Sequence, residues 1–285
     1  MKNLNCSKCA TFWMAVALMT IPALTAEAYQ IPPDVKVTYV NGDLIVRFSK
    51  ADDPNATAPY YAQITPAVVI DQPTSTSIRV TGLASNYTTV NGRRSVTFRV
   101  PTDDLIVDMY KGDVTVRGVN LGRGDDIRVE GTWVDLIDCD AGNMSHSDIV
   151  ATASSRLLID SCSAKRDVQA TASEVCAVGV VVGNDMIADG SRVDVSAAIV
   201  GDEMIVLALS NADLDGVICD DLKVGLGGWS NYAGFVNAVA MVSNCTANYV
   251  QFTGDKGTEG IYEGKGNSFK IMWNMTYLID WIKLM

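Results

Sequence analysis

The segment Asp148-Ile-Val-Ala-Thr-Ala153 belongs to a family of short motifs that recur along the middle of the chain. It is a short apolar stretch rich in β-branched residues, which is typical of a β-strand. The other members are Asp113-Val-Thr-Val-Arg-Gly118, Asp126-Ile-Arg-Val-Glu-Gly131, Asp167-Val-Gln-Ala-Thr-Ala172 and Arg192-Val-Asp-Val-Ser-Ala197. A second family is interleaved with the first and comprises Leu136-Ile-Asp-Cys139, Leu158-Ile-Asp-Ser-Cys162, Val181-Val-Gly-Asn184, Ala208-Leu-Ser-Asn211 and Met241-Val-Ser-Asn-Cys245.

These strand-like units return every 19 to 27 residues, and Asn-Gly turns are missing among them. Strands that repeat without tight turns favour parallel stacking, in which each unit covers the apolar face of its neighbour. We therefore predict an all-β fold, a parallel β-helix (solenoid) over residues 104–265, preceded by a small antiparallel β unit over residues 29–103. Residues 266–285 form a C-terminal amphipathic strand or cap.

The antiparallel unit is predicted from two hairpin signals. Asn41-Gly42 and Asn91-Gly92 each separate two alternating segments, and Asn-Gly accepts the positive φ angles of a type I′ turn. The Pro-rich stretch between them indicates loops and edge strands. This unit is either a separate sandwich or a cap on the first solenoid turn.

Residues 1–28 have the pattern of a signal peptide. Lys2 and Lys8 precede an apolar run, and Ala26-Glu27-Ala28 is a small-x-small cleavage signature. A membrane anchor is the alternative, but the run is short and is broken by Pro22. We expect a secreted, periplasmic or cell-surface protein.

The charge of the chain restricts its partners. The net charge is −11, and removing residues 1–28 makes it −12, because two lysines and one glutamate leave with them. So acidic a chain repels nucleic acid and anionic membrane surfaces. We expect no nucleic-acid partner.

Segments such as Leu158-Ile-Asp-Ser-Cys162 and Met241-Val-Ser-Asn-Cys-Thr246 resemble the strand-then-turn units of right-handed parallel β-helix proteins. The resemblance covers about half the chain and is architectural only. That superfamily includes pectate-lyase-like polysaccharide lyases, polygalacturonase-like hydrolases and bacterial surface adhesins, so it leaves function open.

The acidic cluster Asp213, Asp215, Asp220 and Asp221 is the sharpest catalytic candidate, because glycoside hydrolysis needs two carboxylates across the scissile bond. Asn211-Ala-Asp213 and Asp220-Asp221 are similar to two elements of polygalacturonase-like enzymes. The Gly-His-Gly and Arg-x-Lys elements of that family are absent, and the spacing of the two acidic elements is short. Solvated turn carboxylates are the simpler interpretation.

Other candidates are weaker. Asp138, Asp140 and Asp160 could line one face and hold a Ca²⁺ ion, the one cofactor that the sequence suggests. Cys139 and Cys162 fall at equivalent places in two repeats, so a disulfide between adjacent turns competes with two buried thiols. Trp229 and Tyr232 could stack on sugar rings, although buried aromatic residues are commoner.

No complete catalytic set is present, and the sequence does not name a reaction. The preferred hypothesis is an exported, non-enzymatic β-solenoid, a surface, adhesive or structural protein that binds a cell-surface or matrix polysaccharide or protein. The alternative is a polysaccharide lyase or glycoside hydrolase of the parallel β-helix type. Self-association through Phe269–Met285 is a further possibility, since apolar residues alternate there.

Overall fold

The computed structural model describes residues 31–54, 64–226, 238–254, 260–264, 266–274 and 282–284. The described residues are 65% strand, with almost no helix among them. Within the described residues, no helix has the length and apolarity that a membrane crossing requires. The signal-peptide prediction falls on residues outside those described.

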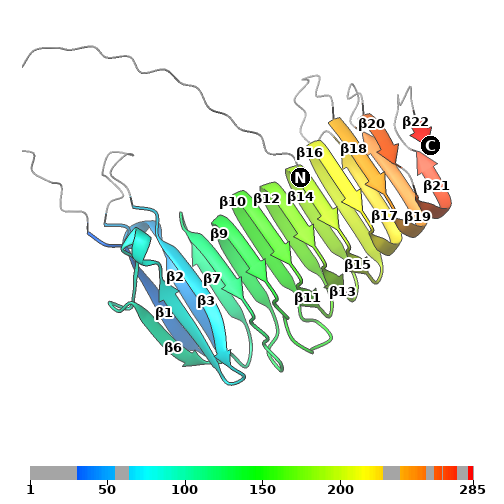
Figure 1. Cartoon of the computed structure of the whole chain (residues 1–285). Coiled ribbons are helices and arrows are strands. Elements are labelled where there is room, and N and C mark those ends of the chain that lie inside the picture. The colour runs from blue at the N-terminus through cyan, green and yellow to red at the C-terminus, as the bar shows by residue number, and fades with distance from the viewer. Residues whose placement is uncertain are drawn as a thin grey trace, which may run out of the picture. The chain divides into compact units, whose positions relative to one another are not determined.

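The strands fall into an antiparallel group followed by a long parallel series (Figure 1). The first group is β1 (Asp34–Val40), β2 (Asp43–Phe48), β3 (Ala67–Thr74), β4 (Ser77–Gly82), β5 (Thr89–Val90) and β6 (Ser95–Arg99), with short 3₁₀ turns η1 (Lys50–Asp52) and η3 (Ala84–Asn86). The series begins with β7 (Leu105–Met109), β8 (Asp113–Arg117), β9 (Ile127–Ile137), β10 (Ile149–Asp160), β11 (Ser163–Ala164), β12 (Val168–Val178), β13 (Val181–Val182), β14 (Met186–Ser196) and β15 (Ile199–Val200). It continues with β16 (Glu203–Asp215), β17 (Ile218–Leu226), β18 (Ala238–Ser243), β19 (Thr246–Gly254), β20 (Gly260–Gly264), β21 (Ser268–Asn274) and β22 (Ile282–Leu284).

The parallel series is a β-solenoid of about six turns, which confirms the predicted fold class. The long strands bend in the middle, so that one strand serves two sheets. In β14, Met186 pairs with Met204 in the first sheet, while Val193 pairs with Ala212 in the second, beyond a register shift after Gly190. Short strands such as β13 and β15 form a third sheet between successive long strands.

The core consists of columns of buried side chains, in which each turn contributes the residue at the equivalent position. One column of the first sheet runs in register through nine turns or capping strands, and every member is fully buried: Leu44, Leu105, Ile127, Ile149, Val168, Met186, Met204, Leu222 and Val250. Burying one such side chain stabilises the fold by roughly 1.5–3 kcal/mol. Stacked burial therefore holds the turns together.

A second repeated feature is a residue with positive φ at the corner after the second sheet. The residues at this corner are Gly118, Asp138, Ser161, Gly179, Ala197, Gly216, Asn244 and Gly266, with φ between 52° and 73°. Glycine adopts this left-handed conformation freely, and Asn and Asp tolerate it better than most residues. The residue that follows is buried wherever its exposure is described up to Cys245, for example Val119 and Val180.

The first predicted hairpin is confirmed. β1 and β2 pair antiparallel around Asn41 and Gly42, which both have positive φ. β2 also pairs parallel with β7, and β3 with β8. The antiparallel unit is thus joined directly to the first solenoid turn.

The second predicted hairpin is confirmed at its turn but not in its strands. Val90 and Arg93 form an antiparallel bridge around Asn91 and Gly92, which both have positive φ, but β5 pairs with β1 and β6 pairs with β4. The Asn91 side chain explains this, because it exchanges two hydrogen bonds with the backbone of Val37, at 3.0 and 2.9 Å. The turn is therefore fastened to β1.

The Pro-rich stretch also differs from expectation. β3 and β4 form a hairpin there, and β3 is paired on both sides, with β4 and β8. Pro73 is tolerated because the β3–β4 register shifts between Asp71 and Thr74. A proline without an N–H can occupy such a bulge.

We predict that Ala197→Gly stabilises the solenoid by about 1 kcal/mol, because alanine is strained at φ 54° and glycine is not. Urea unfolding followed by circular dichroism measures the change. Ala177→Gly is the matched control, because Ala177 is buried in a strand interior, and it should destabilise the protein. Equal loss of stability in both variants would contradict the left-handed corner.

Candidate functional site

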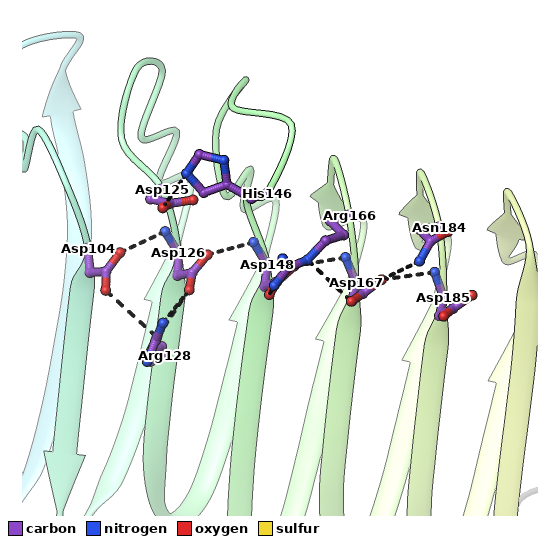
Figure 2. A network of polar contacts seen from close by, with 10 residues as sticks. All are labelled: Asp104, Asp125, Asp126, Arg128, His146, Asp148, Arg166, Asp167, Asn184 and Asp185. Carbon is purple, nitrogen blue, oxygen red and sulfur yellow. Dashed lines mark hydrogen bonds and ion pairs between the residues drawn. The ribbon is translucent and has the colours of Figure 1, made fainter.

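A ladder of carboxylates runs along the corner that precedes the first sheet (Figure 2). One Oδ1 atom per turn accepts the backbone N–H of the equivalent residue on the next turn. The accepting side chains are Asp43, Asp104, Asp126, Asp148, Asp167 and Asp185, and the N···O distances are 3.2, 3.1, 2.8, 3.0, 3.2 and 3.1 Å. The last donor is the amide of Glu203. We call these six residues the aspartate ladder.

Cations offset the repulsion between these stacked carboxylates. Arg128 Nη2 lies 2.6 Å from Asp126 Oδ2, and its Nε lies 3.7 Å from Asp104. The Arg166 guanidinium binds Asp148 through two nitrogens, and its Nε is 3.3 Å from Asp167. Burial and the neighbouring charge of Asp126 nevertheless raise the pKa of Asp104 above its ordinary value.

Beside the ladder, Asp103, Asp104 and Asp125 place carboxylate oxygens within 4.8 Å of one another, the one such acidic group within the described ranges. His146 closes over it, with Nε2 2.9 Å from Asp125 Oδ2. Burial and the charge of Asp126 raise the pKa of Asp125. Carboxylates in this arrangement could accept a hard cation such as Ca²⁺.

The predicted catalytic residues are divided between two sheets. Asp213 and Asp215 lie on β16, where they pair with Asp194 and Ser196 in the second sheet. Asp221 instead pairs with Glu203 at the start of the first sheet. The short third-sheet run at Ile218 separates the two pairs along the chain.

Two of these carboxylates have partners. Asp215 Oδ1 accepts a hydrogen bond from Asn244 Nδ2 at 2.7 Å, and Asp220 Oδ1 accepts one from Asn248 Nδ2 at 2.9 Å. Asn or Asp residues on neighbouring turns thus link the turns at the corners. These contacts are typical of structural roles for side chains at turns.

Asp213 has a different neighbour. It pairs with Asp194 of the preceding turn, so the two residues lie on adjacent strands whose backbones are about 4.8 Å apart. Burial raises the pKa of Asp194, and the charge of Asp213 adds to the effect. The sequence did not indicate Asp194, because nothing distinguishes it before the register is known.

The predicted calcium ligands lie at the opposite corner. Asp138 is a positive-φ residue, Asp140 accepts hydrogen bonds from Gly142 N and Asn120 Nδ2, and Asp160 accepts one from Ser161 Oγ at 2.8 Å. The three do not form a cluster within ligand distance among the described residues, where only the Asp103 group does so. A metal at Asp138, Asp140 and Asp160 stays a prediction.

Cys139 and Cys162 occupy the same buried position on adjacent turns, and both are free thiols. Their mutual hydrogen bond lowers the pKa of Cys139 and raises that of Cys162, which burial raises further. The stacking is as expected, and the disulfide stays a prediction. Cys219 is also buried, and burial raises its pKa to about 12.

Two predicted elements fall wholly or partly outside the described residues. Trp229 and Tyr232 lie outside the described residues. Within Phe269–Met285, β21 continues the stack by pairing with β19, and β22 pairs with β20, while residues 275–281 lie outside the described ranges. Self-association through this segment stays a prediction.

No protein-family model, curated protein or solved structure matches this chain.

We predict that Asp126→Ala destabilises the protein by about 2–3 kcal/mol. The substitution leaves the amide of Asp148, a residue only 7% exposed, without its acceptor. Asp126→Asn keeps the Oδ1 acceptor and should lose about 1 kcal/mol or less, the part due to Arg128. Thermal unfolding measures both, with exposed Asp189→Ala as control. Equal losses for Ala and Asn would contradict the ladder.

A second prediction concerns pH. Because the folded pKa of Asp194 is raised, the folded state binds more protons than the unfolded state between the two pKa values. This contribution to stability therefore falls as pH rises through that window. Asp213→Asn should lower the pKa of Asp194 and stabilise the protein at pH 7 by roughly 0.2–1 kcal/mol, the range for a cross-strand charge pair.

Melting curves between pH 4 and 8 test this, with Asp189→Asn as control because Thr171 and Leu207, its strand neighbours, are uncharged. If the two variants gain equally at every pH, the Asp194–Asp213 repulsion is refuted.

Proposed function

We propose that this chain is an exported, non-enzymatic β-solenoid that acts as a surface, adhesive or structural binding protein. Its binding surface is the outer face of the second sheet, which we call the second-sheet face. We propose further that an extended polysaccharide lies along this face.

The single observation that carries the proposal is an exposed tryptophan whose paired residues on the neighbouring strands are all polar. Trp133 is 54% exposed on β9, and its partners on neighbouring strands are Asp113 and Arg156. The same column continues through Glu174, Arg192 and Asn211. Exposed aromatic rings stack on apolar ligand faces, while hydroxyl groups need donors and acceptors beside the ring.

Regular spacing supports an extended ligand. Equivalent side chains on consecutive turns lie about 4.8 Å apart, the spacing between strands. A polymer that crosses several turns can therefore repeat the same kind of contact. Many weak contacts at fixed spacing give avidity without a deep cleft.

The test is retention on immobilised polysaccharides. Wild type should bind at least one polymer without releasing reducing or unsaturated ends. Trp133→Ala should weaken binding about tenfold or more, as loss of a buried aromatic contact does. Tyr110→Ala is the control, because Tyr110 is 50% exposed and lies outside this face. Unchanged retention of Trp133→Ala would contradict the proposal.

One observation favours a hydrolase as second candidate. Asp194 and Asp213 pair on adjacent strands whose backbones lie about 4.8 Å apart, a spacing that lets their carboxylates approach the ~5 Å separation of retaining glycosidases, and the raised pKa of Asp194 suits a general acid. Asp194→Asn should then abolish release of reducing ends. Release that persists in this variant would refute an Asp194 acid.

A further inference from the structure

Three arginines gather at one end of the second-sheet face, although the chain as a whole carries a net charge of −11. Arg79, Arg94 and Arg117 line an open groove of about 350 Å³ together with Asp71, Thr81 and Ser95. We call this the arginine groove. Its charged groups sum to +2, so its local sign is opposite to that of the molecule.

The strand register places the groove in line with the second-sheet face. Arg117 on β8 pairs with Asp71 on β3 and, on its other side, with Ile137 on β9. Arg79 pairs with Asp71 across the β3–β4 hairpin. The Trp133 column continues through Asp113 to Ala67 on β3, two residues from Val69, which lines the groove.

The single carboxylate does not satisfy the three guanidinium groups. Asp71 binds Arg79 through two contacts, at 3.0 and 2.5 Å, and this ion pair raises the pKa of Arg79. Arg117 is 60% exposed, and its Nη2 lies 4.0 Å from Asp71, at the limit of an ion pair. Arg94 is exposed and forms no ion pair with any residue that the structure describes.

The chemistry of the groove is that of an oxyanion receptor. A guanidinium group presents planar paired donors that match the oxygens of a carboxylate or sulfate. Thr81 and Ser95 pair across β4 and β6 and add hydroxyl donors beside these cations. At physiological salt the screening length is about 8 Å, so these nearby cations outweigh the distant acidic surface.

We propose that the arginine groove binds the oxyanion groups of an acidic polysaccharide, uronate carboxylates or sulfate esters, with Arg94 and Arg117 as the principal donors. This rests on the proposed function, because it names the class of polymer that the second-sheet face accommodates. Asp71 holds Arg79 in place through two contacts.

Three polymers with one backbone test the proposal: neutral dextran, carboxymethyl-dextran and dextran sulfate. The full chain is compared with Arg94→Gln/Arg117→Gln in affinity gel electrophoresis. The control, Arg47→Gln/Arg123→Gln, changes the net charge equally at exposed arginines outside the groove. Melting temperatures confirm that both variants fold.

We expect wild type and control to bind a charged dextran and not the neutral one. The groove variant should lose affinity for the charged dextran by on the order of tenfold or more. The charged dextran that binds distinguishes a carboxylate from a sulfate ligand. Equal binding by the groove variant, equal loss in the control, or no binding of either charged polymer by wild type would overturn the proposal.

Trp133→Ala separates this inference from the proposed function. Charged-dextran binding that depends on the groove arginines but not on Trp133 supports the groove and counts against the second-sheet face. Binding that depends on Trp133 but not on the groove arginines overturns the groove and leaves the proposed function standing.

Discussion

Everything in this protein depends on the in-register stacking of consecutive turns at the spacing of β-strands. Each turn is too thin to bury its own apolar side chains, so it is stable only when its neighbours cover them. The fully buried column from Leu44 to Val250 shows how far this mutual burial extends. Stacking also fixes which polar groups meet, because a residue on one turn can face only its equivalents on the next.

The aspartate ladder and the second-sheet face are two outcomes of that constraint. At the first corner, stacking brings carboxylates together, and the backbone amides of the next turn and two arginines compensate them. On the second-sheet face, the same register places Asp194 against Asp213, and the charge of Arg192 only partly offsets the effects of burial and of Asp213 on the pKa of Asp194. The structural carboxylates of the aspartate ladder therefore lie at one corner of each turn. The side chains available to a ligand lie on another part of the same turn, the second-sheet face.

The sequence predicted the solenoid because short apolar motifs recur without tight turns at a period near 22 residues. It did not predict which motif lies in which sheet of the solenoid. The motif beginning at Asp126 lies in the first sheet, whereas the similar motifs at Asp113 and Arg192 lie in the second. Local alternation is the same in both sheets, so only the strand pairing distinguishes them. The positive-φ corner was not predicted because glycine, aspartate, serine, alanine and asparagine all occupy it.

The candidate sites could likewise be predicted only where residue type was sufficient, and not where strand pairing was needed. The Asp that begins several motifs was visible, but its hydrogen bond to the next turn depends on register. The Asp194–Asp213 pair and the arginine groove could not be predicted from the sequence, because each brings together residues from different strands. The residue type indicates what chemistry a side chain can perform, and the strand pairing determines which side chains lie together.

The most direct measurement is a set of methyl–methyl nuclear Overhauser effects in the intact chain. Leu157, Val175 and Val193 are fully buried and pair in register on three consecutive turns. The stacked arrangement predicts contacts from Leu157 to Val175 and from Val175 to Val193. Contacts of Val175 with residues joined to it by a tight antiparallel reversal, in place of these, would contradict the solenoid.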